Sequence, residues 1–320
     1  MRAFIVDAFG TAPRLEERAE RPVAGPGELL LGVRACGLNF ADLLMIEGKY
    51  QETPTPPFTP GMEISGEVLA LGDGVTGFAV GDRVIGFPGH GGLAEVARVP
   101  AARCVALPEG MDHVTGAAFQ VAYGTSHLAL TGPAGLRAGE TLLVLGAAGG
   151  VGLTAVEIGA QLGARVIAVA RGPEKLAVAK AAGAAHLIDS TAADVRAEVK
   201  ALGGADVVYD PVGGADFTAA LRATRPGGRI LVIGFASGEV PQIPANLLLV
   251  KNVSVIGFYW GGHLTFAPER LTTSLAELMA WHADGRLKPH ISHVLPLDRA
   301  LEGLELLRTR ASTGKVVVTP

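Results

Sequence analysis

Hydrophobic and polar positions follow two different rhythms along the chain. In the first hundred residues, short apolar runs alternate with turns rich in Gly and Pro, a pattern typical of β-strands. The predicted strands span residues 2–6, 28–36, 63–71, 83–87 and 93–99. This part of the chain is therefore predicted to be β-rich and barrel-like.

From residue 120 onward, segments of helical length separate short apolar strands. The predicted strands are 141–145, 165–170, 186–188, 207–209, 229–233 and 254–257. The predicted helices are 120–130, 150–162, 173–182 and 215–223. Strands that alternate with helices in this way specify right-handed crossovers, so we expect a parallel, doubly wound sheet.

The last sixty residues change rhythm again, with helices predicted at 268–283 and 297–308 and a strand at 315–318. This tail is too short for a third domain, so we expect it to fold back onto the first half. The sequence thus predicts a β-rich domain of residues 1–120 and 261–320. The α/β domain, of residues 121–260, is inserted into it. A length of 320 residues suits two such domains.

Composition bears on whether the protein crosses a membrane and in which compartment it is found. Hydrophobic residues make up 49% of the chain, yet glycines interrupt the apolar stretch 141–170, and Pro244 and Lys251 interrupt 242–260. Neither stretch is predicted to cross a membrane. The early charge of Arg2 does not suit a secretory signal, and two cysteines suit a reducing compartment, so we expect a cytoplasmic protein.

Charge argues against two classes of partner. Lys plus Arg number 27 and Asp plus Glu number 31, a net charge of −4 with no block of one sign. Because nucleic acids and anionic membranes attract basic surfaces, neither is expected as a partner.

A glycine-rich turn follows the first strand of the α/β segment. It runs from Gly146 to Gly152 and includes Ala148, Gly149, Gly150 and Val151. Its position between a strand and a helix carries the argument, since glycines at this spacing also occur by chance in a chain with 44 of them. There, glycine lets a pyrophosphate approach the backbone, and the helix N-terminus favours its charge. We therefore predict a dinucleotide site.

The end of the next strand indicates which dinucleotide binds. An NAD site normally has Asp or Glu there, whereas this chain has Arg171, with Lys175 on the following helix. Two cations favour a 2′-phosphate and hence NADP(H). The alternative is that both are solvated surface charges.

Metal ligands are sparse. Cys36 and Cys104 cannot form a four-ligand structural zinc site, and His290 and His293 have no acidic or thiol partner nearby in sequence. No metal is predicted.

Several motifs, in order along the whole chain, resemble the zinc-independent quinone oxidoreductases of the medium-chain dehydrogenase/reductase superfamily. They are Gly37-Leu38-Asn39-Phe40-Ala41-Asp42, Gly48-Lys49-Tyr50, Pro60-Gly61-Met62-Glu63, Gly81-Asp82-Arg83-Val84, Gly91-Gly92-Leu93-Ala94-Glu95, the glycine turn and Gly314-Lys315. The resemblance implies a GroES-like catalytic domain and a Rossmann NADP-binding domain. It also implies hydride transfer from NADPH to quinones or other α,β-unsaturated carbonyls, and a homodimer joined through the Rossmann sheet edge. Positions that hold catalytic zinc in related alcohol dehydrogenases are Asn39, Met62 and Val121 here, which are not useful zinc ligands.

The resemblance also implies roles for individual residues. Asn39, Asp42 and Tyr50 correspond to polar residues beside the nicotinamide. Asn39 and Tyr50 could donate hydrogen bonds to the acceptor, and Asp42 would orient a neighbour. The alternative is that these three are turn-forming polar residues. The remaining predicted cofactor contacts are Thr125, Ser190, Val212, Gly213, Gly234, Phe235, Ala236 and Lys315.

Two departures from the family pattern leave alternatives open. Ser190 stands where many relatives have a tyrosine at the adenosine phosphate, which weakens the expected selectivity for NADPH, and Leu44 replaces a second tyrosine of the cleft. The acceptor could instead be an enoyl thioester, or the chain could be a non-catalytic NADPH-binding protein with a structural or RNA-associated role.

Overall fold

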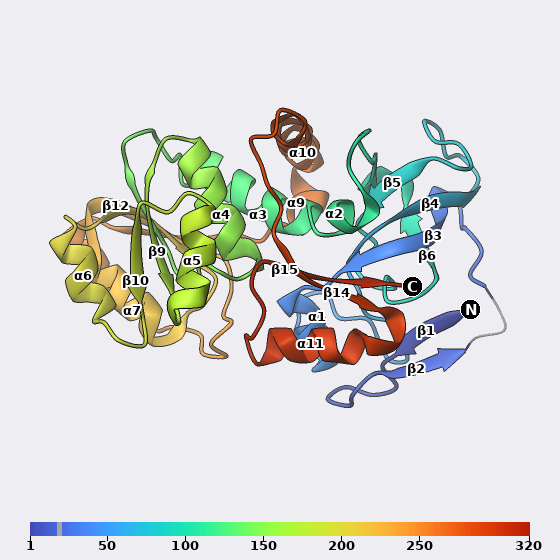
Figure 1. Cartoon of the computed structure of the whole chain (residues 1–320), viewed down its shortest axis with the longest axis horizontal. Helices are drawn as coiled ribbons and strands as arrows, with labels where there is room; N and C mark the ends of the chain where they lie inside the picture. Colours follow the sequence, from blue (N-terminus) through green and yellow to red (C-terminus); the bar gives the residue numbers. More distant parts are fainter. Residues whose placement is uncertain (18–20) are drawn as a thin grey trace. The chain divides into compact units, whose positions relative to one another are not determined.

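The computed structural model describes residues 1–17 and 21–320, and its internal contacts divide them into two compact units. The β unit comprises Met1–Val121 and Pro289–Pro320, and the parallel-sheet unit comprises Ala122–Lys288. Figure 1 shows antiparallel strands in the first and alternating strands and helices in the second. The two rhythms of the sequence therefore correspond to two folding units.

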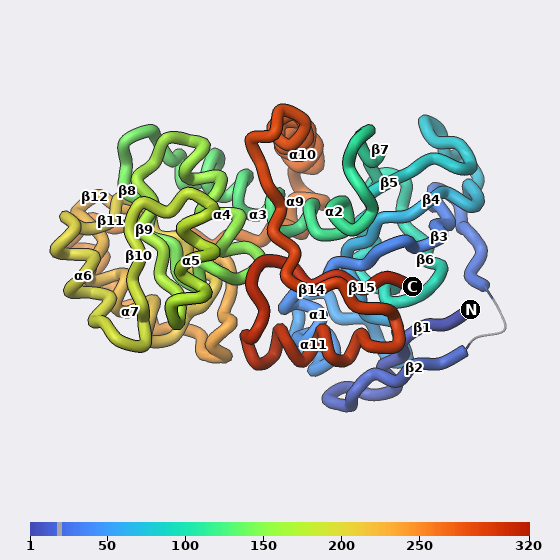
Figure 2. The backbone as a smooth tube through the Cα atoms, in the orientation of Figure 1, coloured from blue at the N-terminus to red at the C-terminus, as the bar shows by residue number. Residues whose placement is uncertain are grey.

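The β unit is built around one mixed sheet whose strands come from both ends of the chain. The order is β14 (Ile291–Pro296), β15 (Lys315–Thr319), β3 (Glu28–Gly37), β4 (Glu63–Leu71), β5 (Arg83–Gly86) and β7 (Cys104–Ala106), with β6 (Val96–Pro100) paired to β3. A hairpin of β1 (Arg2–Ile5) and β2 (Arg14–Glu17) lies beside it. The helices are α1 (Phe40–Ile46), α2 (His113–Ala117) and α11 (Ala300–Arg308), with short 3-10 turns at Ala101–Arg103 and Leu297–Arg299. Figure 2 shows the red C-terminal strands β14 and β15 beside the blue β3, to which β15 pairs.

The parallel-sheet unit has six parallel strands in the order β10, β9, β8, β11, β12, β13. Their bounds are Thr141–Val144 (β8), Arg165–Ala170 (β9), His186–Asp189 (β10), Ala205–Asp210 (β11), Thr224–Val232 (β12) and Ser254–Gly257 (β13). The order reverses between β8 and β11. At such a switch point, the loops after the two strands leave in opposite directions and open a crevice at the carboxyl edge.

Helices cover both faces of this sheet. The helices α4 (Gly150–Gln161), α5 (Pro173–Ala181), α6 (Val195–Ala201), α7 (Gly214–Ala223) and α8 (Ala245–Lys251) contact its strands. The other helices of this unit are α3 (Gln120–Thr131), α9 (His263–Phe266) and α10 (Pro268–Ala283). On one face, Leu143, Val208 and Ile230 from three neighbouring strands pack with Phe217 of α7, and all four are fully buried. A continuous apolar layer of this kind fixes the strand ends that carry the candidate site.

The predicted fold class is confirmed, but the contacts place the return to the β unit at Pro289 rather than at residue 261. The physical reason is the packing of α10 on α3. The Nδ1 atom of His127 lies 2.8 Å from Ser274 Oγ, and the His127 ring meets Trp281 edge-on. Residues 261–288 therefore belong with the parallel sheet.

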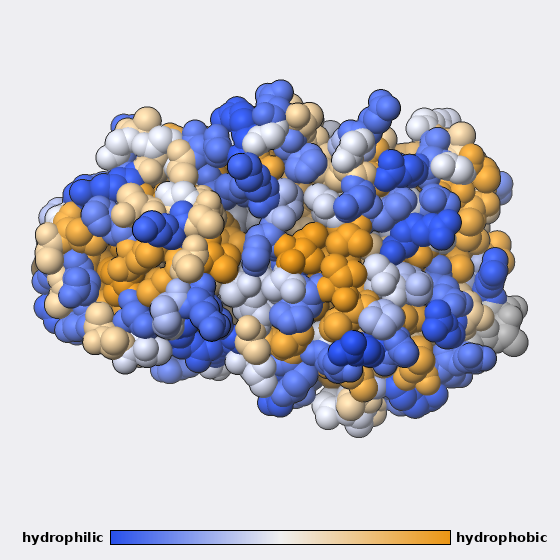
Figure 3. Space-filling model, viewed as in Figure 1, coloured by the Kyte–Doolittle hydropathy of each residue, from blue (hydrophilic) through white to orange (hydrophobic). Residues whose placement is uncertain are grey.

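No helix within residues 1–17 and 21–320 is both long and apolar enough to cross a membrane. On the face shown in Figure 3, apolar and hydrophilic residues are interspersed over both units.

Candidate functional site

The glycine turn lies at the switch point and packs tightly against the start of α4. Gly146 has a φ of +57°, in the region that favours glycine, and lies two residues after the end of β8 at Val144. A Cβ atom added to Gly152 would lie only 2.2 Å from the carbonyl oxygen of Gly146. Glycine at residue 152 therefore lets the first turn of α4 approach the loop, as the sequence pattern predicts.

The first turn of α4 presents backbone donors at this edge. Gly149 caps the helix, and the N–H groups of Gly150, Val151 and Gly152 have no acceptor in the part of the chain that the structure describes. Three unpaired N–H groups at the positive end of a twelve-residue helix favour an anion. Together with the close approach at Gly152, they fit a pyrophosphate.

Buried hydroxyl groups hold this turn in place from behind. Ser126 of α3 donates to the Val151 carbonyl at 2.9 Å, and its Oγ also lies 2.8 Å from Thr154 Oγ1 and 2.9 Å from the Tyr209 hydroxyl. Thr125, a predicted cofactor contact, is the preceding residue and is buried. The network thus links the helix of Thr125 to the glycine turn.

The ends of β9 and β10 form the next part of the edge. Arg171 follows β9, is exposed, and has no ion-pair partner among the described residues. Lys175 lies on the first turn of α5 and is half-buried. Ser190 follows β10 and donates its N–H to the Ala170 carbonyl at 3.1 Å. The predicted determinants of the 2′-phosphate therefore follow adjacent strands.

Asp189, the last residue of β10, lies at the same place and was not among the predicted site residues. Its Oδ1 accepts hydrogen bonds from the Thr191 hydroxyl at 2.7 Å, the Thr191 N–H at 2.9 Å and the Gly172 N–H at 3.1 Å. The hydrogen bond from the Thr191 side chain, with those from the two N–H groups, lowers the pKa of Asp189. A carboxylate at the end of the third strand could have been noticed in the sequence, next to Ser190.

Asp210 organises the loops after β11 and β12. Its buried Oδ1 accepts from the N–H of Val212 at 2.7 Å and of Gly213 at 2.9 Å, and burial raises the pKa of Asp210 to about 6. The backbone of this loop in turn accepts hydrogen bonds from the next one, including Ala236 N–H to Pro211 O at 3.0 Å. The structure therefore brings together the predicted residues Val212, Gly213, Gly234, Phe235 and Ala236. Asp210 itself was missed as a site residue.

In the β unit, a buried ion pair occupies the place where cofactor and substrate contacts were predicted. Lys315 Nζ donates to Glu63 Oε1 at 2.5 Å, to Asn39 Oδ1 at 2.8 Å and to the Leu38 carbonyl at 2.9 Å. An ammonium group has three N–H donors, so all of them bind within the β unit. The contact of Lys315 with the cofactor stays a prediction.

Asn39 belongs to the same cluster. Its Nδ2 donates to Glu63 Oε1 at 2.9 Å and to the Gly37 carbonyl at 3.2 Å, which uses both amide hydrogens. The second Glu63 oxygen accepts from the Val121 N–H at 2.9 Å. Asn39 is thus held as a partner of the ion pair, and its hydrogen bond to an acceptor oxygen stays a prediction.

Asp42 orients backbone rather than substrate. Its two oxygens accept from the N–H of Asn39 at 2.8 Å and of Gly61 at 3.0 Å, and burial raises its pKa to about 6. Tyr50 lies in the turn after α1, half-buried, and its carbonyl accepts from the Thr53 hydroxyl. Of the three predicted catalytic residues, Tyr50 is therefore the one outside the buried cluster.

Residues 1–17 and 21–320 contain no group of three or more His, Cys, Asp or Glu side chains placed to hold a metal ion. Both cysteines are buried and free.

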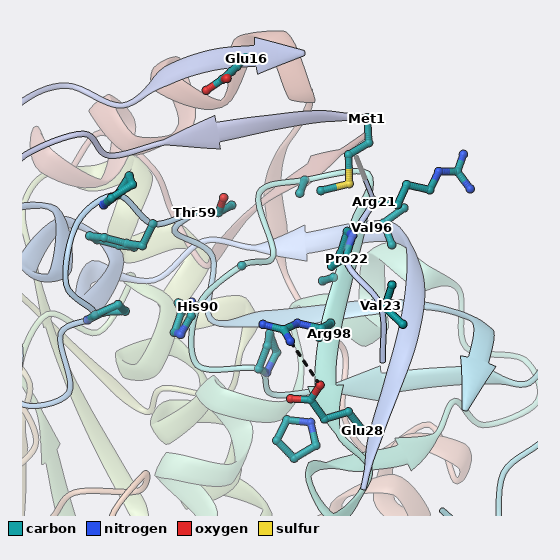
Figure 4. Close-up of a pocket in the computed structure, with 18 of the residues that line it drawn as sticks. Met1, Glu16, Arg21, Pro22, Val23, Glu28, Thr59, His90, Val96 and Arg98 are labelled. Atoms are coloured by element: carbon teal, nitrogen blue, oxygen red, sulfur yellow. Dashed lines mark ion pairs between the residues drawn. The ribbon is translucent and has the colours of Figure 1, made fainter. Parts of the chain in front are cut away.

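A groove of about 1020 Å³ opens elsewhere in the β unit (Figure 4). Arg98 and Glu28 form an ion pair of 3.8 Å on its wall, near His90. None of the predicted site residues lines this groove. Its size is therefore no argument for the dinucleotide site, which rests on the strand ends and glycine turn described above.

Comparison with known proteins identifies both units. The family described as "Alcohol dehydrogenase GroES-like domain" matches residues 25–109, and the family described as "Zinc-binding dehydrogenase" matches residues 150–281. A GroES-like β unit with a Rossmann unit is the arrangement of the medium-chain dehydrogenases and reductases.

Comparison with individual proteins shows to which family within this superfamily the chain belongs. A protein of Nematostella vectensis named "Quinone oxidoreductase-like protein 2 homolog" is 41% identical over 323 residues, covering 99% of this chain and 88% of its own. The quinone oxidoreductase of Thermus thermophilus, solved also with NADPH, is 35% identical with a TM-score of 0.87. That of Escherichia coli, complexed with NADPH, is 27% identical with a TM-score of 0.94. Each of these two similarities covers 100% of this chain and 100% of the chain in the solved structure. The chain belongs to the quinone oxidoreductase family of the medium-chain dehydrogenase/reductase superfamily.

Proposed function

We propose that this protein is an NADPH-dependent reductase that transfers hydride to quinones or other α,β-unsaturated carbonyls without a metal. The observation that carries the proposal is the carboxyl edge of the parallel sheet. There, three unpaired N–H groups of α4 and the exposed Arg171 follow two neighbouring strands. The NADPH complexes of two related quinone oxidoreductases support the same cofactor.

Different residues of this chain would bind different parts of the cofactor. The N–H groups of Gly150, Val151 and Gly152 would hold the pyrophosphate, and Arg171 with Lys175 would hold the 2′-phosphate. The loops tied together by Asp210 would carry the contacts of Val212, Gly213 and residues 234–236 near the nicotinamide. When bound, NADPH supplies the hydride.

The demands on the protein at the acceptor are small. As hydride arrives, negative charge develops on the acceptor oxygen, and a hydrogen-bond donor aimed at that oxygen lowers the barrier. Because both amide hydrogens of Asn39 are used by Glu63 and Gly37, we assign this role to the hydroxyl of Tyr50.

The test has two parts. Titration of the purified protein with NADPH, followed by fluorescence, measures binding; consumption of NADPH with a panel of quinones, enones and enoyl thioesters measures turnover. We expect saturable binding and turnover with quinones or enones. Binding without any turnover would make the protein a binder rather than an enzyme, and preference for enoyl thioesters would replace the proposed acceptor.

We also propose a homodimer joined along β13. This strand pairs with β12 on one side, and the described strands provide no neighbour on the other. Apolar side chains are exposed on the preceding loop and α8, with Val240 62%, Leu249 77% and Val250 71% accessible. Such an edge tends to be paired or covered. Sedimentation at micromolar concentration should show a dimer, and a monomer would contradict the proposal.

A further inference from the structure

We propose that Asp189 is a second determinant of dinucleotide selectivity, acting against the 2′-phosphate that Arg171 and Lys175 favour. This inference rests on the proposed NADPH-dependent function. It identifies a residue of the third strand, rather than of the second, as the carboxylate that a ribose 2′-hydroxyl would meet.

The geometry places the carboxylate against the turn that carries Arg171. Asp189 lies beside Ala170 in the register of β9 and β10. Its Oδ1 is 3.1 Å from the N–H of Gly172, the residue that directly follows Arg171. The two strand ends are also joined by the hydrogen bond from the Ser190 N–H to the Ala170 carbonyl. Asp189 thus braces the turn from the neighbouring strand.

The carboxylate is charged at neutral pH. Three donors, two of them from Thr191, converge on Oδ1 and lower its pKa. The turn also faces open space, because a Cβ added to Gly172 would have no atom within 4 Å. A ligand group next to the turn therefore meets the positive charge of Arg171 and the negative charge of Asp189 together.

These opposite charges affect the two cofactors differently. A 2′-phosphate is attracted by Arg171 and Lys175 and repelled by Asp189, whereas a 2′-hydroxyl can donate a hydrogen bond to a carboxylate. The chain should therefore accept NADH as well as NADPH, with a modest preference for NADPH.

The decisive variant is Asp189→Asn, because the amide oxygen can still accept the three hydrogen bonds while the charge is removed. We expect the ratio of the dissociation constants, NADH over NADPH, to rise about fivefold. The change should shrink as salt is added, because an exposed charge is screened. A purely structural role in the turn would not produce this salt dependence.

Glu174→Gln is the matched control. Glu174 is an exposed carboxylate on the first turn of α5, and its substitution removes the same charge three residues from Arg171. An equal change in this control would show a general surface-charge effect and overturn the assignment to Asp189.

The remaining outcomes separate the two proposals. If the unmodified protein binds NADPH but Asp189→Asn leaves the ratio unchanged, the inference about Asp189 is wrong and the proposed function stands. If the unmodified protein binds neither dinucleotide, the proposed function fails, and the inference fails with it.

Discussion

The carboxyl edge of the parallel sheet and the buried cluster of the β unit both collect residues that the sequence marks for function, but they use them in opposite ways. At the sheet edge, backbone N–H groups and the Arg171 side chain are left without partners in the described chain. In the cluster, Lys315, Glu63, Asn39 and Asp42 use their polar atoms on one another and on nearby backbone. Unused donors indicate binding, and fully paired ones indicate structure.

The largest effect that would test this contrast is expected from Lys315→Met. Removing the ammonium leaves the fully buried Glu63 carboxylate without its cation, and breaking a buried pair in this way costs about 3 to 5 kcal/mol. Urea unfolding measures the loss. As a control, Glu302→Ala breaks the exposed pair with Arg299 and should change stability little. Equal, small losses in both variants would contradict the structural role of the cluster.

The double substitution of Arg171 and Lys175 by alanine tests cofactor binding at the carboxyl edge of the parallel sheet. Because charge-assisted contacts to a 2′-phosphate would be lost, KM for NADPH should rise about ten- to a hundredfold. NADH kinetics should stay nearly unchanged. Should the unmodified protein use both cofactors with equal kcat/KM, the two cations would be ordinary surface charges.

Two glycines of the turn can be compared directly. Gly152→Ala places a methyl group 2.2 Å from a backbone oxygen, so we expect a loss of about 1 to 3 kcal/mol in unfolding free energy. Gly149→Ala meets that oxygen at an ordinary 3.4 Å and should leave stability nearly unchanged. A fall in NADPH affinity in the stable Gly149→Ala variant would locate the dinucleotide at the turn. Normal affinity there would place it elsewhere.

Tyr50→Phe should have the smallest effect, about a tenfold loss of turnover with little change in NADPH affinity, if its hydroxyl stabilises the acceptor oxygen. Steady-state kinetics and a binding titration separate the two quantities. Unchanged turnover with every acceptor that the protein reduces would reduce Tyr50 to a packing role.

Much of the fold is predictable because its signals are local. The strands 63–71, 165–170 and 254–257 and the helix 268–283 occur in the structure with the predicted bounds. Some short elements were missed. The strand β2 reads Arg-Leu-Glu-Glu and has no apolar run, and the seven residues of α1 are too few to show a clear helical period. The predicted helix 297–308 begins instead as a 3-10 turn.

In the candidate site too, residues whose constraints are local in sequence could be predicted, and residues with distant partners could not. Gly152 could be interpreted from sequence because its constraint comes from a turn a few residues away. Lys315 could not, because its partners Asn39 and Glu63 lie 276 and 252 residues earlier. A motif shows that such a lysine matters but not what it binds.

The long distance in sequence between Lys315 and its partners also affects the order in which the two units can fold during synthesis. The parallel-sheet unit is one continuous stretch and can complete its core as soon as it leaves the ribosome, whereas the β unit needs both ends of the chain. At 5 to 20 residues per second, Glu63 waits roughly 10 to 50 s for Lys315 to be made. During that interval its carboxylate must remain hydrated, and β3 must remain without β15. We therefore expect the inserted unit to fold first and the β unit, which begins the chain, to be completed last.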